Sequence, residues 1–216
     1  MRYLVSFHPL CATRRGRDAV LRHGFPPFSD GSCRREPDLE LSHPSISALC
    51  RNRRFAPRLQ IGDSVAYISI ANRYNRPEQH WRLVALLQVL HRFETHEDAE
   101  RWYREHEPRL PGNCMVPGNP PLALTQTGGP GDADLREKIS RVPDADIVAE
   151  WDRRYAERVK GTPVFLACLP IAVNLRDPPA ISRSDWLSWH GRVPGTQSYF
   201  RPPESLWSQL CLRAGV

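Results

Sequence analysis

Twenty-one prolines are spread along this chain of 216 residues, and they limit the fold more than any other feature. Proline has a fixed φ and no backbone N–H, so it interrupts helix interiors and central strands. The hydrophobic fraction of 40% is ordinary for a globular protein. A chain of this length can bury well over half of its unfolded surface in one core. We therefore expect a single domain over residues 1–216 with long, proline-rich loops.

Two apolar runs predict the centre of a β-sheet. Residues 64–70 read Ser-Val-Ala-Tyr-Ile-Ser-Ile after the Gly62-Asp63 turn, and residues 81–93 form a second apolar stretch. Both runs are rich in residues that favour strands. The polar segment 71–80 between them suits a wide hairpin loop, so the two strands are expected to pair. Further strands are expected at residues 2–7 and 164–169.

Helix signals follow the second of these strands. Thr95 can cap a helix whose first turn contains two acidic residues, and that helix is expected to end near His106. Residues 147–159 carry apolar side chains at helical spacing and predict a packed helix. Short helices are expected at residues 18–23, 184–187 and 205–207. This pattern predicts an α+β fold with a mixed, mainly antiparallel sheet and flanking helices.

The six cysteines are scattered, with no Cys-x-x-Cys pair and no secretory leader ahead of them. We therefore expect free thiols, a cytoplasmic protein and no metal. The longest apolar run, residues 83–90, is far shorter than the roughly 18 residues of a membrane span. Residues 127–131 are rich in glycine but lack the lysine of a P-loop. No membrane association and no cofactor are expected.

Positive charge is concentrated at the start of the chain. Residues 1–60 hold 11 arginines against 5 acidic residues, whereas residues 61–216 hold 19 basic and 19 acidic residues. Only Lys138 and Lys160 are lysines, so nearly every cation is a guanidinium group, which makes bidentate contacts with phosphate and guanine. A GC-rich genome could explain the excess of arginine over lysine, but not its segregation. The charge pattern favours a nucleic acid as partner.

Arginine clusters close to aromatic residues indicate where a nucleic acid would bind. Guanidinium groups contact phosphates, and aromatic rings stack on bases. Trp81, Trp189 and Tyr199 lie beside loops and could stack, while Asn113, Asn119 and Ser182 could read the edge of a base. The alternative is that the arginines are solvated loop charges. The predicted nucleic-acid-binding residues are Arg34, Arg35, Arg51, Arg53, Arg54, Trp81, Asn113 and Asn119.

Four stretches of the chain carry a resemblance to a known family. They are Cys-Arg-Arg-Glu-Pro-Asp at 33–38, His-Pro-Ser-Ile-Ser-Ala-Leu-Cys-Arg at 43–51, Phe-Ala-Pro-Arg-Leu-x-Ile-Gly-Asp-Ser-Val-Ala-Tyr at 55–67, and Asn-Cys-Met-Val-Pro-Gly-Asn-Pro-Pro at 113–121. Together they resemble the nucleotide modification associated domain 2 family, which is proposed to act in systems that synthesise or recognise modified DNA bases. The resemblance implies binding of DNA or a modified nucleotide, with partner proteins of a DNA modification system.

The turn at Gly62-Asp63 adds an expectation about the fold. A Gly-Asp turn ahead of a hydrophobic strand is similar to the turn in PUA-like barrels, a group that includes readers of modified bases. A partly open PUA-like β-barrel is therefore one form that the predicted sheet could take. Within it, the chain is expected to be a nucleic-acid-associated domain that accommodates a nucleotide between aromatic side chains.

An enzyme acting on a nucleotide or modified base is the rival interpretation. A cysteine nucleophile needs a base to activate it and a third group to orient that base. Cys50 or Asp38 would be the reactive group, with His43, Asn113 and Cys114 as the remaining candidates. No local signature ties these residues together, and isolated cysteines are more often inert core residues.

Two other sites are weaker alternatives. His8 and the cysteines at 11, 33 and 50 could hold a metal, but structural zinc normally uses closely spaced pairs. Asp38 and Glu40 would lie on one side of a strand and could serve as acid and base. Salt bridges with the neighbouring arginines explain these two carboxylates more simply.

Overall fold

The computed structural model describes residues 1–49, 53–196 and 199–216. Within these ranges the strands form one mixed sheet in the order β2-β5-β4-β3-β1-β7, with β6 paired to β4. Only β1 and β3 are parallel among the described pairs, and the rest are antiparallel. The strands are β1 (Arg2–Phe7), β2 (Ser45–Ser47), β3 (Ser64–Ser69), β4 (Trp81–Phe93), β5 (Phe165–Val173), β6 (Ala180–Ile181) and β7 (Tyr199–Phe200).

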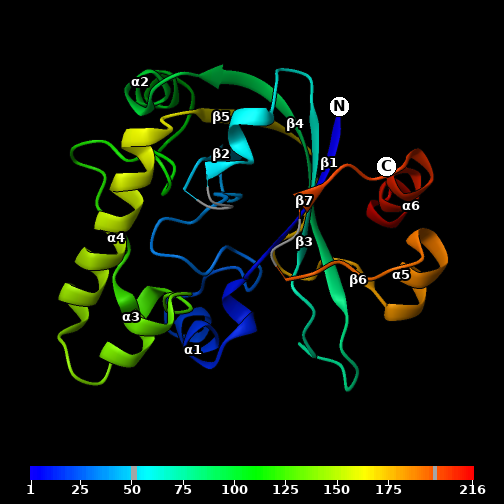
Figure 1. Cartoon of the computed structure of the whole chain (residues 1–216), viewed down its shortest axis with the longest axis horizontal. Helices are drawn as coiled ribbons and strands as arrows, with labels where there is room; N and C mark the ends of the chain where they lie inside the picture. The colour runs from blue at the N-terminus through cyan, green and yellow to red at the C-terminus, as the bar shows by residue number, and fades with distance from the viewer. Residues whose placement is uncertain (50–52, 197–198) are drawn as a thin grey trace.

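The sheet curls into an open half-barrel (Figure 1). The long strand β4 pairs with β3 on one side and with β5 on the other, and irregular register interrupts both pairings. Such bulges increase the local twist and bend of a strand. The predicted strands at 2–7 and 81–93 and the pairing of β3 with β4 are confirmed. Strand β5 extends to Val173, beyond the end predicted at residue 169, because β4 pairs with it as far as Val173.

Helices flank the sheet on two sides (Figure 1). Helices α5 and α6 pack on its outer face, while α1, α3 and α4 lie across the inner side. The bounds are α1 (Arg14–His23), α2 (His96–His106), α3 (Ala133–Lys138), α4 (Asp144–Gly161), α5 (Arg183–His190) and α6 (Glu204–Ala214), with 3-10 turns η1 (Leu10–Ala12), η3 (Ala56–Arg58) and η4 (Leu124–Gln126). The structure therefore confirms an α+β fold with a mixed sheet and flanking helices.

Local signals explain where the helices begin and end. Thr95 Oγ1 accepts a hydrogen bond from the backbone N–H of Asp98 at 3.0 Å, which confirms the predicted cap of α2. Helix α1 begins at Arg14, four residues before the predicted start, because Thr13 Oγ1 caps the N–H of Gly16. The short helical turns expected near the end of the chain are longer helices. Ser182 and Asp185 form a reciprocal capping box at the start of α5.

Alternating side chains along the strands divide the core into two halves. On β1, Val5 and Phe7 pack inside the half-barrel with Phe55 and Tyr67. Leu4 points to the outer face, where α5 and α6 contribute apolar side chains, including Trp186 and Trp207. Successive residues of a strand face opposite sides of a sheet, so one short strand supplies both halves. Among the described helices, none has the length and apolar character needed to cross a bilayer.

Gly16 is the point where α1 approaches η1 most closely. A Cβ atom at this position would lie 1.8 Å from the carbonyl oxygen of Leu10, which is backbone and cannot turn aside. Gly16→Ala is therefore expected to lower the free energy of unfolding by about 2 kcal/mol through overpacking. Urea unfolding of Gly16→Ala and of the control Gly131→Ala, where a Cβ meets open space, measures the difference. Equal stability of the two variants would contradict the close approach.

Candidate functional site

Arg34 is a buried structural residue. Its side chain is 4% exposed, and its Nε and Nη2 donate to the two carboxylate oxygens of Asp152 on α4 at 2.5 and 2.8 Å. Its Nη1 donates to the carbonyl of Asn119 at 2.6 Å. These bonds occupy both edges of the guanidinium group that would face a phosphate. Arg34 is therefore buried away from the outer surface. It links its own loop and the loop of Asn119 to α4.

Arg35 is also buried, at 4% exposed. Its Nη1 donates to the carbonyl of Asp30 at 2.6 Å and its Nη2 to that of Gln126 at 3.0 Å. The guanidinium carbon lies 5.0 Å from the ring centroid of Phe25, and Nε lies 3.6 Å from a carboxylate oxygen of Glu40. The simpler explanation for Glu40, a salt bridge with a neighbouring arginine, is confirmed. Arg35 holds the loop together and does not contribute to an outer surface.

The second arginine cluster is only partly described. Arg51 lies outside the described residues, as does Cys50. Arg53 and Arg54 are both exposed. A Cβ on Gly161 would lie 2.7 Å from Nη1 of Arg53, which places this guanidinium at the C-terminal end of α4. Of the described arginines predicted to bind nucleic acid, Arg53 and Arg54 are the two with exposed side chains.

Trp81 and the two asparagines have partners inside the protein. Trp81 is 5% exposed and meets Trp186 edge-on, with ring centroids 6.1 Å apart, in the outer half of the core. Asn119 donates to the carbonyls of Pro111 and Cys114 at 2.9 and 2.6 Å. Asn113 is fully buried. The burial of Trp81 and Asn113 keeps both from stacking on or reading a base at the surface.

Glu36 occupies the centre of the inner half of the molecule, and Asn113 is one of its partners. Its side chain is 4% exposed, and Asn113 Nδ2 donates to its Oε2 at 2.8 Å. Ser47 Oγ also donates to Oε2, and the Ser47 backbone N–H lies 3.1 Å from both carboxyl oxygens. Three of the stretches quoted for the family resemblance thus meet at this carboxyl group. No cation partner of Glu36 is found among the described residues.

Burial without a cation changes the acidity of Glu36. Desolvation raises its pKa from 4.5 to about 8, although the donors from Ser47 and Asn113 oppose that shift, and the nearby Asp30 carboxylate adds to it. Glu36 is therefore a neutral carboxylic acid over most of the physiological pH range. A strongly shifted carboxyl group in a cavity is a recognised mark of a functional site.

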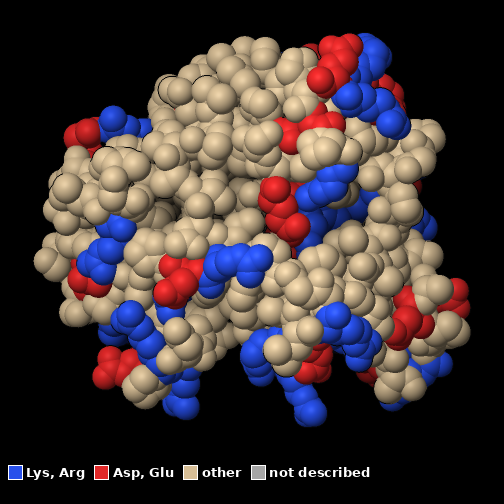
Figure 2. All heavy atoms as spheres, turned by 180° about the vertical axis from the view of Figure 1, so that it is seen from behind, with Lys and Arg blue, Asp and Glu red and all other residues tan. Residues whose placement is uncertain are grey.

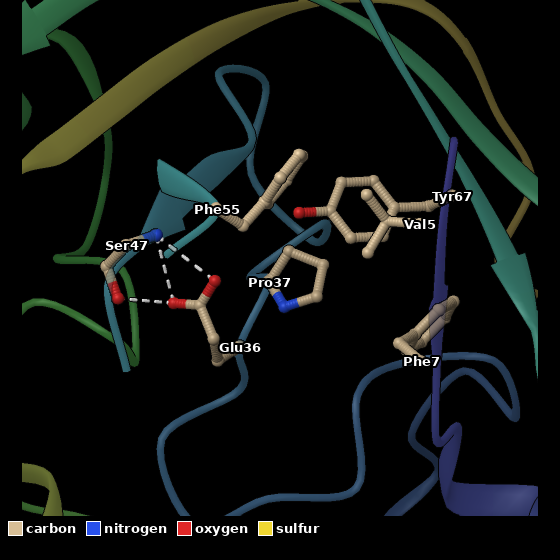
Figure 3. A pocket seen from close by; sticks show the side chains of 7 residues that line it. All are labelled: Val5, Phe7, Glu36, Pro37, Ser47, Phe55 and Tyr67. Carbon is tan, nitrogen blue, oxygen red and sulfur yellow. Dashed lines mark hydrogen bonds between the residues drawn. The ribbon is translucent and has the colours of Figure 1, made fainter. Parts of the chain in front are cut away.

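A small pocket lies in front of this carboxyl group (Figure 3). It leaves about 10 Å³, room for one water-sized group. Figure 3 shows Glu36 and Ser47 on one side and the strand residues of β1 and β3 on the other, with the Tyr67 hydroxyl directed toward Phe55. We call this the Glu36 pocket; its lining residues are Val5, Phe7, Glu36, Pro37, Ser47, Phe55 and Tyr67.

A second feature lies next to the pocket, where β7 and η3 meet. The Phe55 ring contacts Tyr199 on β7, with centroids 5.4 Å apart. Exposed Arg58 lies over the Tyr199 ring at 5.6 Å, and exposed Arg192 lies over Phe200 at 5.9 Å. Exposed Arg201 lies over the Tyr3 ring at 5.5 Å. We call the arginine–aromatic surface the three arginines Arg58, Arg192 and Arg201 together with the rings of Phe55, Tyr199, Phe200 and Tyr3. Within the described ranges, none of its three arginines forms a salt bridge.

A hollow of about 360 Å³ opens on this surface. Its walls include Arg192, Tyr199 and Phe200, and the ring of His190 stacks on Phe200 at 5.1 Å with an interplanar angle of 7°. Small-molecule sites typically range from about 300 to 1,000 Å³. The hollow therefore combines the size of a ligand site with planar rings and the guanidinium group of Arg192, and Arg58 lies over the Tyr199 ring in its wall.

Elsewhere on the molecule many arginines are paired with carboxylates, although exposed Arg14, Arg17 and Arg22 of α1, like Arg53 and Arg54, form no salt bridge within the described residues. Figure 2 shows one face on which arginine and lysine side chains are interleaved with aspartate and glutamate. Helix α4 provides an example, because Arg153 and Arg154 both pair with Glu150, and Arg154 also pairs with Asp134. Paired charges neutralise each other on α4, and within the N-terminal surplus Arg34 and Arg35 are buried.

The described residues of the cysteine-based enzyme hypothesis are bonded to other partners or buried, and Cys50 lies outside the described residues. Asp38 is bound by Arg109 and by the Gly112 N–H, each at 2.8 Å, while His43 Nδ1 lies 2.8 Å from Glu107 Oε1. Cys114 is fully buried, and desolvation raises the pKa of its thiol to about 12. Such a thiol is not an activated nucleophile. The described residues contain no cluster of three or more metal-ligating side chains.

Comparison with known proteins finds no match to a family model, a curated protein or a solved structure. Functional inference therefore depends on the geometry of the site. The functional candidates that sequence reasoning missed are Glu36, Arg58, Arg192 and Arg201. Glu36 follows two arginines in the sequence, so its lack of an ion pair has no local signature. The three arginines are far apart in the chain, so only their position beside aromatic rings identifies them.

Proposed function

We propose that this chain is a nucleic-acid-associated domain that binds DNA or a nucleotide on the arginine–aromatic surface. The observation that carries the proposal is the hollow beside β7, where exposed guanidinium groups lie over aromatic rings without acidic partners in the described residues. Unpaired arginines attract phosphate, and the rings offer stacking faces for bases. Tyr199 keeps the stacking role predicted from the sequence, while Arg58, Arg192 and Arg201 replace Arg34 and Arg35.

Two more specific parts of the proposal, the PUA-like barrel and the role with modified DNA bases, come from the resemblances noted in the sequence. A curled, open sheet with flanking helices is compatible with a PUA-like barrel, and a role in reading or making modified DNA bases is compatible with a base-sized hollow. We propose that the domain works in a DNA base modification system, where partner proteins supply whatever chemistry it lacks. The buried thiol of Cys114 and the fully bonded Asp38 give no support to catalysis by those groups.

The test is a binding panel read by fluorescence anisotropy. Single- and double-stranded DNA with plain and modified bases are titrated at several salt concentrations, with the wild-type chain and with the double variant Arg58→Gln/Arg192→Gln. For single strands, the slope of log K against log salt is expected to shrink by about 1.4, or about 0.7 for each lost phosphate contact. Affinity should fall for all sequences alike, because phosphate contacts carry no sequence information.

The matched control is Arg141→Gln/Arg153→Gln, which removes the same charge from arginines that pair with Glu137 of α3 and Glu150 of α4. This control should bind like the wild type. If both double variants lose affinity equally, binding depends on net charge and the proposed surface is wrong. If wild-type affinity does not change between low and physiological salt, phosphate contacts do not hold the ligand.

A further inference from the structure

The Glu36 pocket has a chemical character that the arginine–aromatic surface does not explain. Oε2 of Glu36 accepts from both Asn113 Nδ2 and Ser47 Oγ, which fills its two lone-pair positions. Oε1 accepts only from the shared N–H of Ser47 at 3.1 Å. The proton of the neutral acid therefore belongs on Oε1. Figure 3 shows that this oxygen faces the side of the pocket formed by Pro37 and Phe55.

Opposite Glu36, the walls of the pocket are apolar except for the Tyr67 hydroxyl. Val5, Phe7 and Phe55 are apolar and each is at most 3% exposed. Val5, Phe7 and Tyr67 are fixed in the paired strands β1 and β3, whereas Phe55 is in no strand and caps the three-residue turn η3. Phe55 is also the wall that separates the pocket from Tyr199 on the arginine–aromatic surface. The side chain of Phe55 is thus the natural point of access from that surface.

We propose that Glu36 is the specificity-determining acid of the proposed nucleotide site, donating a hydrogen bond from Oε1 to an acceptor atom on the nucleobase, such as a carbonyl oxygen or an unprotonated ring nitrogen. The inference rests on the proposed function, since the base reaches the pocket past Phe55 while its phosphate stays with the arginines. About 10 Å³ admits one polar atom of the base, and the ring packs against Phe55.

The charge state of Glu36 makes this recognition dependent on pH. A carboxylate would repel an acceptor atom, so binding should fail as Glu36 ionises. The titratable groups that face Glu36 are Asp30 from the same loop, Tyr67 from β3 and Cys168 from β5. Desolvation raises the pKa of Asp30 as well, so Asp30 needs its own control.

The experiment uses 1-methylcytosine and 9-methyladenine, which carry no phosphate and do not titrate between pH 6.5 and pH 9.5. Their binding to the full chain is followed by NMR shift changes. Wild-type affinity is expected to fall at least about tenfold across this range, as expected for loss of one hydrogen bond. Glu36→Gln keeps an N–H donor that cannot ionise, so its affinity should stay constant with pH. Glu36→Ala should bind at least about tenfold more weakly at pH 6.5.

The control Asp30→Asn should keep a pH-dependent affinity, because Asn Oδ1 can still accept the bonds that Asp30 Oδ1 accepts from Ser32 and Glu36. Its midpoint should move only to lower pH, because the Asp30 charge that raises the pKa of Glu36 is removed. Constant wild-type affinity across the range, the same profile in Glu36→Gln, or no binding of either base at pH 6.5 would overturn the inference. These ligands need no arginine contact. Binding of the bases without salt-sensitive DNA binding would therefore reject the proposed nucleic-acid surface and leave the role of Glu36 standing.

Discussion

Arg34→Ala will destabilise the fold by about 4 kcal/mol, the loss expected when one partner of a buried ion pair is removed. The substitution leaves the Asp152 carboxylate without its bidentate partner and the Asn119 carbonyl without a donor. The Asp152 side chain is 22% exposed, so water compensates only in part. Urea unfolding followed by tryptophan fluorescence measures the change.

The control is Arg153→Ala on the same helix as Asp152. Arg153 pairs with Glu150, but its side chain is 60% exposed, and exposed pairs contribute about 0 to 1 kcal/mol. The double variant Arg34→Met/Asp152→Leu should regain much of the lost stability, because it removes both charges together. If Arg34→Ala folds with wild-type stability and selectively loses DNA affinity, the structural role given to Arg34 is wrong.

Glu36 is expected to lower the stability of the protein as pH rises from 4.5 to about 8. His96, whose pKa desolvation lowers to about 4, contributes a slope of opposite sign below pH 6.5, so the effect of Glu36 is read as the difference from Glu36→Gln. From pH 4.5 to about 8 the folded chain keeps a proton on Glu36 that the unfolded chain releases, so this group binds more protons in the folded state. The contribution of Glu36 to the free energy of unfolding must then decrease with rising pH, by up to about 1 kcal/mol per pH unit, and level off above the folded pKa. Denaturant unfolding at a series of pH values measures this slope.

Glu36→Gln should remove that slope. The amide stays neutral at every pH and its oxygen can accept the bonds that Ser47 and Asn113 donate to Oε2. The variant is therefore expected to exceed the wild type in stability above pH 8, and the gap should close toward pH 4.5. Glu40→Gln, on the same loop but in ion pairs with Arg35 and Arg109, is the control that should keep the wild-type slope. An unchanged slope in Glu36→Gln would show that Glu36 is ionised in the folded protein.

The sequence by itself determined the parts of this protein that depend on neighbours along the chain. Apolar runs rich in strand-forming residues specify β1, β3 and β4, and the eleven residues between β3 and β4 hold them close enough to pair. Thr95 and the acidic residues after it specify the start of α2. These signals act over a few residues, so strand-forming runs and helix caps suffice to predict them.

Only the tertiary structure decided what the charged residues do. Arg34 and Asp152 are 118 residues apart in sequence, and Glu36 and Asn113 are 77 apart. The arginine–aromatic surface likewise joins Arg58 to residues near position 200. Whether an arginine binds a phosphate or an internal carboxylate depends on which group the fold brings within about 3 Å of it. Sequence can count such charges, but desolvation and pairing act through space, and the chain brings those partners together only when it folds.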